Sequence, residues 1–246
     1  MSVESLKFIW EKIQGEAQLL AYNEPVLAKF LHDTVLQHNH IGNALSYILS
    51  EKLGNTTVSA NVIRDVIEEA YNMNATIIIY AVRDIFFSLQ RDPVIDKYST
   101  PFLYFKGFHA LQAYRISHWL WLQDRYALAV YFQNRISVLF GVDIHPAARI
   151  GYGVMLDHAT GIVIGETAVV ANNVSILQSV TLGSTGKKGS GDRHPKIGEG
   201  VIIGAGAILL GNIEIGYMAK VGAGSVVLHS VPSCVTVAGI VARIVK

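Results

Sequence analysis

The sequence has little charge of either sign and only one cysteine. Lys and Arg together number 20, and Asp and Glu together number 19, which gives a formal net charge of +1. A chain this close to neutral provides no bulk electric field to attract nucleic acid or an acidic membrane surface, so neither is expected as a partner. Cys234 has no second cysteine to pair with, which excludes an internal disulfide and suits a reducing cytoplasm.

Long hydrophobic runs are also missing. No stretch approaches the roughly 18 consecutive apolar residues of a membrane-spanning helix. The N-terminus lacks the basic segment and apolar core of a secretory signal peptide, so we expect a cytoplasmic protein without a membrane anchor. Even so, 51% of the residues are hydrophobic and the mean hydropathy is +0.35. Buried repeats and contacts between subunits would account for this apolar excess.

Glycine is scarce before residue 141, with four in residues 1–140 and 18 in residues 141–246. This shift indicates two domains, 1–140 and 141–246. Apolar residues in the first part recur at helical spacing. They predict helices over 3–14, 25–35, 41–53, 62–70 and 75–89, and two more between 101 and 140 that are separated near Asp124 and Arg125. Asn23 is expected to cap the second helix, because Pro25 suits a first turn.

In the second part an apolar residue recurs every six positions. The 13 positions are Ile144, Ile150, Leu156, Ile164, Val170, Ile176, Leu182, Ile197, Ile203, Leu209, Ile215, Val221 and Val227, and a glycine follows seven of them. A period of six fits neither a helix nor an extended strand. It fits a prism of short strands with three sides per coil, whereas a sandwich would show turn signals every 8–12 residues. The sequence therefore predicts an α+β protein in which helices precede a parallel β-helix. The helices would either cover the open end of the prism or join subunits.

Two insertions interrupt this register. One adds two residues within 157–161, and the other adds nine within the loop 183–196. Repeat scaffolds accept insertions as outward loops, and rigid scaffolds place functional groups on such loops. Each insertion carries a histidine beside charged residues, so both are candidate sites.

Asp157 and His158 lie in the first insertion. Histidine can act as a general base near neutral pH, and it works best when an acid orients its second nitrogen. Asp143 precedes His158 by 15 residues, close to the 18 of one coil, so both could lie along one edge. The alternative is a surface histidine beside an unrelated aspartate.

Arg193 and His194 close the second insertion. A guanidinium suits a carboxylate, and His194 could hold a hydroxyl. Alternatively, this glycine- and lysine-rich loop is merely solvated. Asp92 is a weaker candidate, because it stands where a helix stops before Pro93, and a carboxylate there is usually a cap or simply exposed. The other histidines read as structural or surface residues, and no metal-ligand cluster is predicted.

No Gly-Lys-Ser/Thr phosphate loop or GxGxxG signature occurs in the sequence. A ligand that contains a nucleotide would have to lie along the outside of the prism. Backbone amides around Ala205, Gly206, Ala223 and Gly224, with Lys220 nearby, could bind it. The alternative is that these glycines only form corners.

These motifs resemble those of bacterial serine O-acetyltransferases. The specific ones are Asp-His-Ala-Thr-Gly from Asp157 and Gly-Asp-Arg-His-Pro from Gly191. Asp-Ile-His-Pro-Ala-Ala from Asp143 and Arg-Asp-Pro from Arg91 agree with them, so the resemblance covers nearly the whole chain. It implies a left-handed parallel β-helix, with the helical domain serving oligomerisation.

The resemblance implies acetyl transfer from acetyl-CoA to L-serine, the committed step toward cysteine, with no permanently bound cofactor or metal. His158 would be the general base and Asp143 would orient it. Substrate ligands would be Asp92, Asp157, Arg193 and His194, with L-cysteine as an inhibitor at the same site. CoA would contact Gly183, Thr185, Ala205, Gly206, Lys220, Ala223 and Gly224. The family also implies trimers, paired into hexamers, with the active site between adjacent prisms.

The sequence departs from the family in three places. The loop before Gly191 is about one residue longer than usual, and Val241 replaces a common proline. Relatives often carry a further C-terminal tail that docks in cysteine synthase, whereas this sequence ends at Lys246, so that complex is not expected. Acetylation of homoserine, a sugar or an antibiotic remains the alternative reaction. A non-catalytic scaffold and a zinc hydratase of the carbonic anhydrase type are alternatives of other classes.

Overall fold

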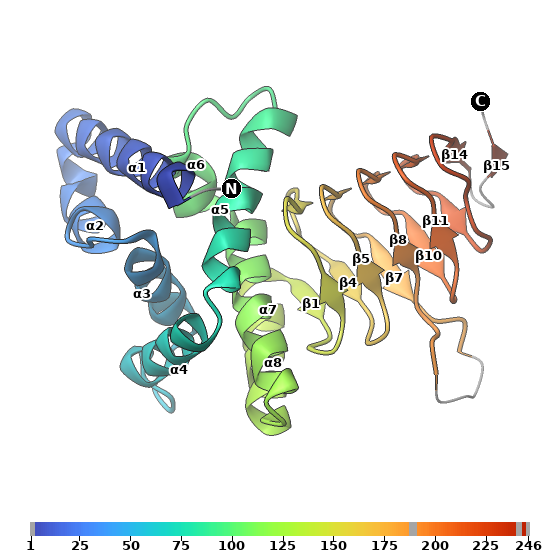
Figure 1. Cartoon of the computed structure of the whole chain (residues 1–246), viewed down its shortest axis with the longest axis horizontal. Coiled ribbons are helices and arrows are strands. Elements are labelled where there is room, and N and C mark those ends of the chain that lie inside the picture. The colour runs from blue at the N-terminus through green and yellow to red at the C-terminus, as the bar shows by residue number, and fades with distance from the viewer. Residues whose placement is uncertain (1–2, 187–190, 240–242, 245–246) are drawn as a thin grey trace.

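The structure, a computed structural model, describes residues 3–186, 191–239 and 243–244. A group of helices packs against one end of a long parallel β-solenoid (Figure 1). The helices are α1 (Val3–Asn23), the 3-10 helix η1 (Pro25–Leu27), α2 (Ala28–Leu31), the π-helix η2 (His32–Leu36), α3 (Ile41–Leu53), α4 (Ala60–Met73), α5 (Thr76–Arg91), α6 (Ser99–Tyr104), α7 (Lys106–Leu122) and α8 (Tyr126–Phe140). None of the helices in the described ranges is long and apolar enough to cross a bilayer.

Most helices agree with the predicted ranges, and three details differ. Helix α1 continues to Asn23, well past the predicted end at residue 14. Asn23 ends α1 instead of capping the next helix, which begins as a 3-10 turn with no side-chain cap at Glu24. The segment from 101 to 140 contains three helices instead of two, because extended backbone at Phe105 separates α6 from α7. Ser59 caps α4, since its side chain accepts a hydrogen bond from the backbone amide of Val62.

The solenoid has about five turns and three sheets. Sheet A contains β1 (Val142–Ile144), β4 (Ile162–Ile164), β7 (Thr181–Gly183), β10 (Ile208–Leu210) and β13 (Val226–Val227). Sheet B contains β2 (Arg149–Ile150), β5 (Val169–Val170), β8 (Lys196–Ile197) and β11 (Glu214–Ile215). Sheet C contains β3 (Met155–Leu156), β6 (Ser175–Ile176), β9 (Ile202–Ile203), β12 (Lys220–Val221), β14 (Thr236–Ala238) and β15 (Arg243–Ile244).

Corresponding strands of successive turns pair in parallel, as in Ile144 with Ile164 and Ile164 with Leu182. This register stacks the six-residue anchors on one another. Twelve of the 13 anchors are buried, and Ile150 is half-buried. The predicted parallel β-helix is therefore confirmed. The turns that lead from sheet C to sheet A stack as one edge, the C-to-A corner, and those from sheet A to sheet B stack as another, the A-to-B corner.

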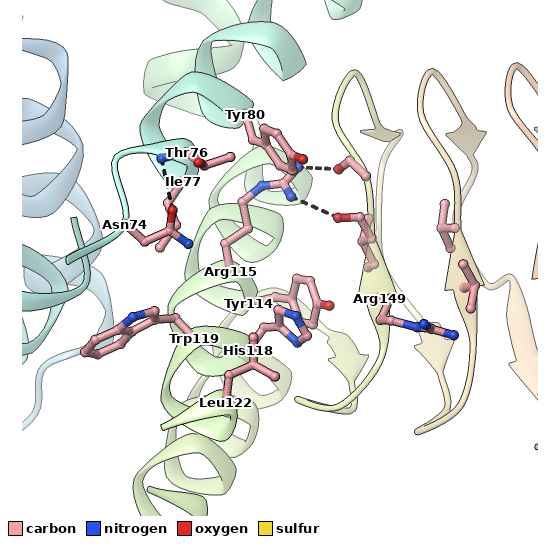
Figure 2. Close-up of a pocket in the computed structure, with 14 residues that line it drawn as sticks. Asn74, Thr76, Ile77, Tyr80, Tyr114, Arg115, His118, Trp119, Leu122 and Arg149 are labelled. Carbon is pink, nitrogen blue, oxygen red and sulfur yellow. Dashed lines mark hydrogen bonds between the residues drawn. The ribbon is translucent and has the colours of Figure 1, made fainter. Parts of the chain in front are cut away.

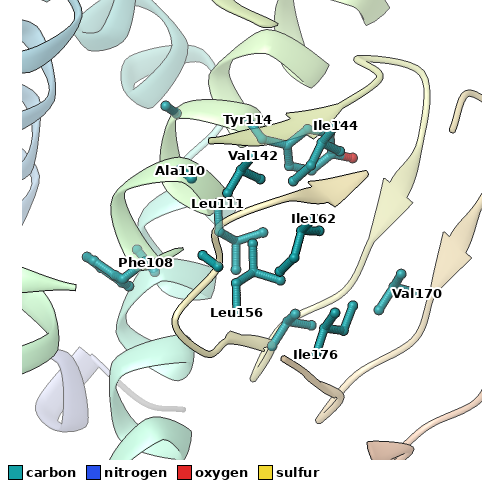
Figure 3. Packing of buried hydrophobic residues seen from close by; sticks show 14 of the residues in the cluster. Phe108, Ala110, Leu111, Tyr114, Val142, Ile144, Leu156, Ile162, Val170 and Ile176 are labelled. Carbon is teal, nitrogen blue, oxygen red and sulfur yellow. The ribbon is translucent and has the colours of Figure 1, made fainter. Parts of the chain in front are cut away.

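The helices cover the open end of the solenoid. Helix α7 packs Leu111 and Tyr114 over Val142, Ile144 and other apolar residues of the first coil, so that one core runs through both parts (Figure 3). The first coil also has backbone groups with no preceding coil to bond them, and a buried group of that kind is costly to leave unpaired.

Side chains of α5 and α7 bond these edge groups. Arg115 donates to the carbonyl oxygens of Ile150 and Gly151 (Figure 2). The Tyr114 hydroxyl donates to the carbonyl oxygen of Ala148. Asp84 accepts from the amide of Val154 at 3.0 Å and from Arg115 at 2.7 Å. The sequence pattern left the role of the helices open, and these contacts show that they cap the solenoid.

A buried histidine in the cap makes stability depend on pH. His109 is 1% exposed, and its Nε2 lies 2.8 Å from the carbonyl oxygen of Phe102. Burial lowers the pKa of His109 to about 4, against an ordinary value near 6.5. The unfolded chain binds the proton more strongly, so the stabilising contribution is complete above about pH 6.5 and is lost as the pH falls toward 4.

We expect the folded state to lose roughly 2 kcal/mol from this group between about pH 7 and pH 5. Urea unfolding at both pH values should show a smaller pH dependence for His109→Gln than for the wild type. His40→Gln is the control, because His40 is exposed. Equal pH dependence in wild type and His109→Gln would show that His109 does not carry the effect.

Candidate functional site

Three of the predicted site residues lie around one pocket. Asp92, Asp157 and His158 line a cavity of about 270 Å³ together with Leu156 and the residues 104–107 that join α6 to α7. Asp92 follows α5, whereas Asp157 and His158 form the C-to-A corner of the first coil. The pocket thus joins the helical cap to the solenoid, with two carboxylates and an imidazole at its wall.

Arg91 fixes Asp92 in this position. Its guanidinium donates to the Ser175 hydroxyl at 2.7 Å and to the backbone oxygen of Asn173, both in the second coil. The Asp92 carboxylate accepts from the amide of Val94 at 2.9 Å, which stabilises the turn after the helix. Asp92 therefore stabilises the turn after α5 through one hydrogen bond, and its carboxylate also lines the pocket.

The turn that carries His158 has an uncommon backbone. His158 and Ala159 have φ values of 55° and 57°, in the left-handed region that few residues other than glycine adopt. Such conformations persist when surrounding contacts determine them, and they occur often at functional sites. The His158 side chain is 74% exposed, and its Nε2 lies 3.8 Å from Oδ1 of Asp157.

Asp143 lies on the same edge of the solenoid as this turn. The amide of Gly161 donates to the carbonyl oxygen of Gly141 at 2.7 Å, so the turn leads into the strand next to Asp143. The Asp143 carboxylate accepts from Gln133 of α8 at 2.7 Å. Among the described residues no hydrogen bond joins Asp143 to His158, and the expected orienting contact remains a prediction.

Arg193 and His194 lie at a different corner of the same chain. They sit against Glu166 and Thr167 at the A-to-B corner, whereas His158 is at the C-to-A corner. Arg193 forms an ion pair with Glu166, and its hydrogen bond holds the pKa of that carboxyl below its ordinary value. Within a single chain, Arg193, the predicted partner of the substrate carboxylate, is therefore not brought to the His158 pocket.

Thr167 and Gly165 position the end of this loop, although neither stands out in the sequence as a functional residue. The Thr167 hydroxyl accepts from the amides of Arg193 at 3.0 Å and His194 at 3.1 Å. A Cβ on Gly165 would lie 2.0 Å from Nε2 of His194, so only glycine leaves room for the ring. Threonine and glycine are common at the corners of such repeats, so the sequence gives no signal that these two hold Arg193 and His194 in place.

His194 is held as a neutral imidazole. Its Nδ1 accepts from the amide of Thr167 at 3.1 Å, and the ring is 7% exposed. Burial, aided by the charge of Arg193, lowers the pKa of His194. Since Nδ1 is the acceptor, Nε2 carries the proton and can donate to a ligand oxygen.

The predicted CoA-binding residues divide between the same two corners. Gly183 and Thr185 lie at the A-to-B side, where β7 ends. Ala205, Gly206, Ala223 and Gly224 stack at the C-to-A corner, and Lys220 lies on β12, the strand that leads into Ala223 and Gly224. There Ser179 bonds Thr160, Gly206 bonds Gln178, and Gly224 bonds Ala205, each through backbone groups. This corner is a continuous track that begins at His158 and extends for roughly three strand spacings of about 4.8 Å.

Two further features of the molecule bear on the alternatives. No group of three His, Cys, Asp or Glu side chains that could hold a metal occurs in the described ranges, and a zinc hydratase site would need such a group. A larger cavity of about 460 Å³ lies between α5, α7 and sheet B, around Tyr80, His118 and Arg149 (Figure 2). It contains none of the predicted site residues.

Comparisons with known proteins agree with the motifs. The family profile described as serine acetyltransferase, N-terminal, matches residues 9–113. The serine acetyltransferase of Escherichia coli strain K12 is 62% identical over 245 residues, which cover 100% of this chain and 89% of that protein.

Two solved structures are similar over nearly the whole chain. A serine acetyltransferase in complex with cysteine has a TM-score of 0.96 and 58% identity, with 100% of both chains covered. One in complex with CoA has a TM-score of 0.94 and 57% identity, and covers 98% of this chain and 100% of its own. The chain described here is therefore an acyltransferase and belongs to the bacterial serine O-acetyltransferase family.

Proposed function

We propose that the protein transfers the acetyl group of acetyl-CoA to the hydroxyl of L-serine, giving O-acetyl-L-serine and CoA. The main support is the pocket in which Asp92 and Asp157 stand beside an exposed imidazole. A zwitterionic amino acid needs negative partners for its ammonium, and its hydroxyl needs a base. A sugar acceptor would need neither carboxylate.

In this reaction His158 takes the proton of the serine hydroxyl as the oxygen attacks the thioester carbonyl. A bond forms between Oγ of serine and the acetyl carbonyl carbon, the C–S bond of the thioester breaks, and the thiolate of CoA receives the proton that His158 took from the hydroxyl. Asp143 orients the imidazole, and Asp92 and Asp157 hold the ammonium. Acetyl-CoA lies along the C-to-A corner, where no atom stands within 4 Å of a Cβ built on Gly206 or Gly224, which leaves space for an extended chain.

We propose that the site is completed by a second subunit. The outward row of sheet A follows the register Asp143, Val163, Thr181, Ile208 and Val226, so beyond Asp143 it is apolar except for Thr181. The corresponding row of sheet B is more charged, since it carries Arg149, Val169, Lys196 and Glu214. Val163 is 40% exposed and Ile208 is 37% exposed in the single chain.

Sheet A connects the corner that holds His158 to the corner that holds Arg193. If three copies turn this face toward a common axis, the His158 corner of each copy meets the Arg193 corner of the next. Arg193 then pairs with the substrate carboxylate, and His194 donates from Nε2 to the substrate. In the same proposal the helical domain pairs trimers into hexamers through exposed residues such as Tyr22 and Val26, which are 85% and 87% exposed.

The same residues account for inhibition by L-cysteine. Cysteine has the ammonium and carboxylate of serine, so it would contact Asp92, Asp157 and Arg193 in the same way while placing a thiol at His158. The proposal also includes a cytoplasmic location, which the free, exposed Cys234 suits.

The direct test is an acceptor profile with acetyl-CoA. We expect L-serine to be acetylated with a higher kcat/KM than homoserine, D-serine or a sugar alcohol such as glycerol. L-cysteine should raise the apparent KM for L-serine, because both occupy one site. A preference for a sugar hydroxyl, or cysteine inhibition that serine does not relieve, would contradict the proposal.

A further inference from the structure

The turn that carries His158 needs contacts from outside itself. Within the turn, Ala159 donates to the carbonyl oxygen of Asp157 at 2.6 Å, and Thr160 donates to that of His158 at 2.7 Å. These short-range bonds close a tight loop with two successive left-handed residues. An unsupported loop of this kind would relax toward more populated conformations.

The N-terminus of α7 lies directly against this turn. A Cβ placed on Gly107 would be 2.0 Å from the carbonyl oxygen of Leu156 and 3.0 Å from Cβ of Ala159. Only glycine therefore allows the helix to approach both ends of the segment that holds Asp157 and His158. The break at Phe105 creates this helix start, and residues 104–107 all line the pocket.

Lys106 contacts the other side of the same turn. Its ammonium donates to the Thr160 hydroxyl. That hydroxyl lies 3.5 Å from the carbonyl oxygen of His158, to which it can donate in turn. A chain of polar contacts thus joins the first residue of α7 to the backbone of His158.

We infer that Lys106 and Gly107 are positioning residues, which set the place of the His158 imidazole by holding its turn against α7. The inference rests on the proposed role of His158 as the base. The imidazole is largely exposed, so few side-chain contacts fix it and its backbone determines where it points. A displacement of about 1 Å can lower a catalysed rate up to roughly 100-fold, so these contacts would act on turnover more than on binding.

The test compares Lys106→Met, Thr160→Val and the double variant with the wild type. We expect each single change to lower kcat about tenfold and to alter the KM for acetyl-CoA by less than about twofold. Because each change removes the same contact, that between Lys106 and Thr160, the double variant should have a kcat little lower than that of the poorer single variant. Lys106→Arg and Thr160→Ser keep the contact and should restore most of kcat. Deuterium uptake by residues 156–162 should rise in the variants that lose it.

Lys52→Met is the control, since Lys52 is an exposed lysine of α3. Gly107→Ala should give a larger loss of kcat, measured only if the variant retains the wild-type unfolding midpoint. The inference would be overturned if Lys106→Met and Thr160→Val both kept the wild-type kcat and deuterium uptake. It would also be overturned if the fall in kcat of the double variant equalled the product of the two single-variant falls. If the wild type itself fails to acetylate serine, the proposed function fails, while the uptake comparison still decides whether α7 holds the turn.

Discussion

Replacement of His158 by alanine should abolish most turnover and leave the fold intact. A positioned general base contributes about 10²–10⁴-fold to a rate, so kcat for acetyl transfer to L-serine should fall by that factor. The side chain is 74% exposed, so its removal takes little packing away, and the unfolding midpoint should change little. Steady-state kinetics and thermal unfolding of the same preparation measure both effects.

His229→Ala provides the matched control for this experiment. His229 is also exposed, but it lies in the last coil, far along the solenoid from the helical cap. Its loss should leave kcat unchanged. If His158→Ala keeps near-normal turnover, the base must be another group, and the pocket between α7 and the first coil loses its proposed role.

The periodic part of the fold could be predicted from the sequence because its physics is local and repeated. Each anchor such as Ile164 or Ile203 packs against its counterpart one coil away, so one six-residue rule predicts every strand. The insertions at 157–161 and 183–196 stand out because they break that rule. The motifs within them led to the family.

The structure of the helices that cover the end of the solenoid was less predictable where they contact the site. Apolar spacing around Phe105 is compatible with a continuous helix, and it gives no sign of the break that brings Gly107 against Leu156. The role of Arg115 is also hidden in the sequence, since its partners are backbone oxygens of a coil that is distant along the chain. Such contacts depend on the assembled fold and leave no periodic signal.

The spacing of residues in the sequence did not reveal that the site is divided between two corners either. His158 and Arg193 each belong to a recognisable motif, but which corner each occupies depends on how the strands between them are distributed among the three sheets. One chain keeps them apart, so the proposed chemistry depends on an interface that sheet A would form.

Mixed oligomers of two inactive variants test this claim most directly. His158→Ala removes the base from one corner, and Arg193→Ala removes from the other corner the guanidinium that pairs with the substrate carboxylate. Arg193→Ala should weaken the binding of L-serine by roughly tenfold to 100-fold, because a charged hydrogen bond is lost. Each variant alone should therefore have little activity when L-serine is well below its KM.

When the two variants are co-expressed in equal amounts, each shared site draws one residue from each of two neighbouring chains. About a quarter of the sites in randomly mixed oligomers should then contain both wild-type residues. We predict that the mixture recovers about a quarter of wild-type activity, well above that of either parent. Activity no greater than the average of the two parents would contradict a site shared between subunits.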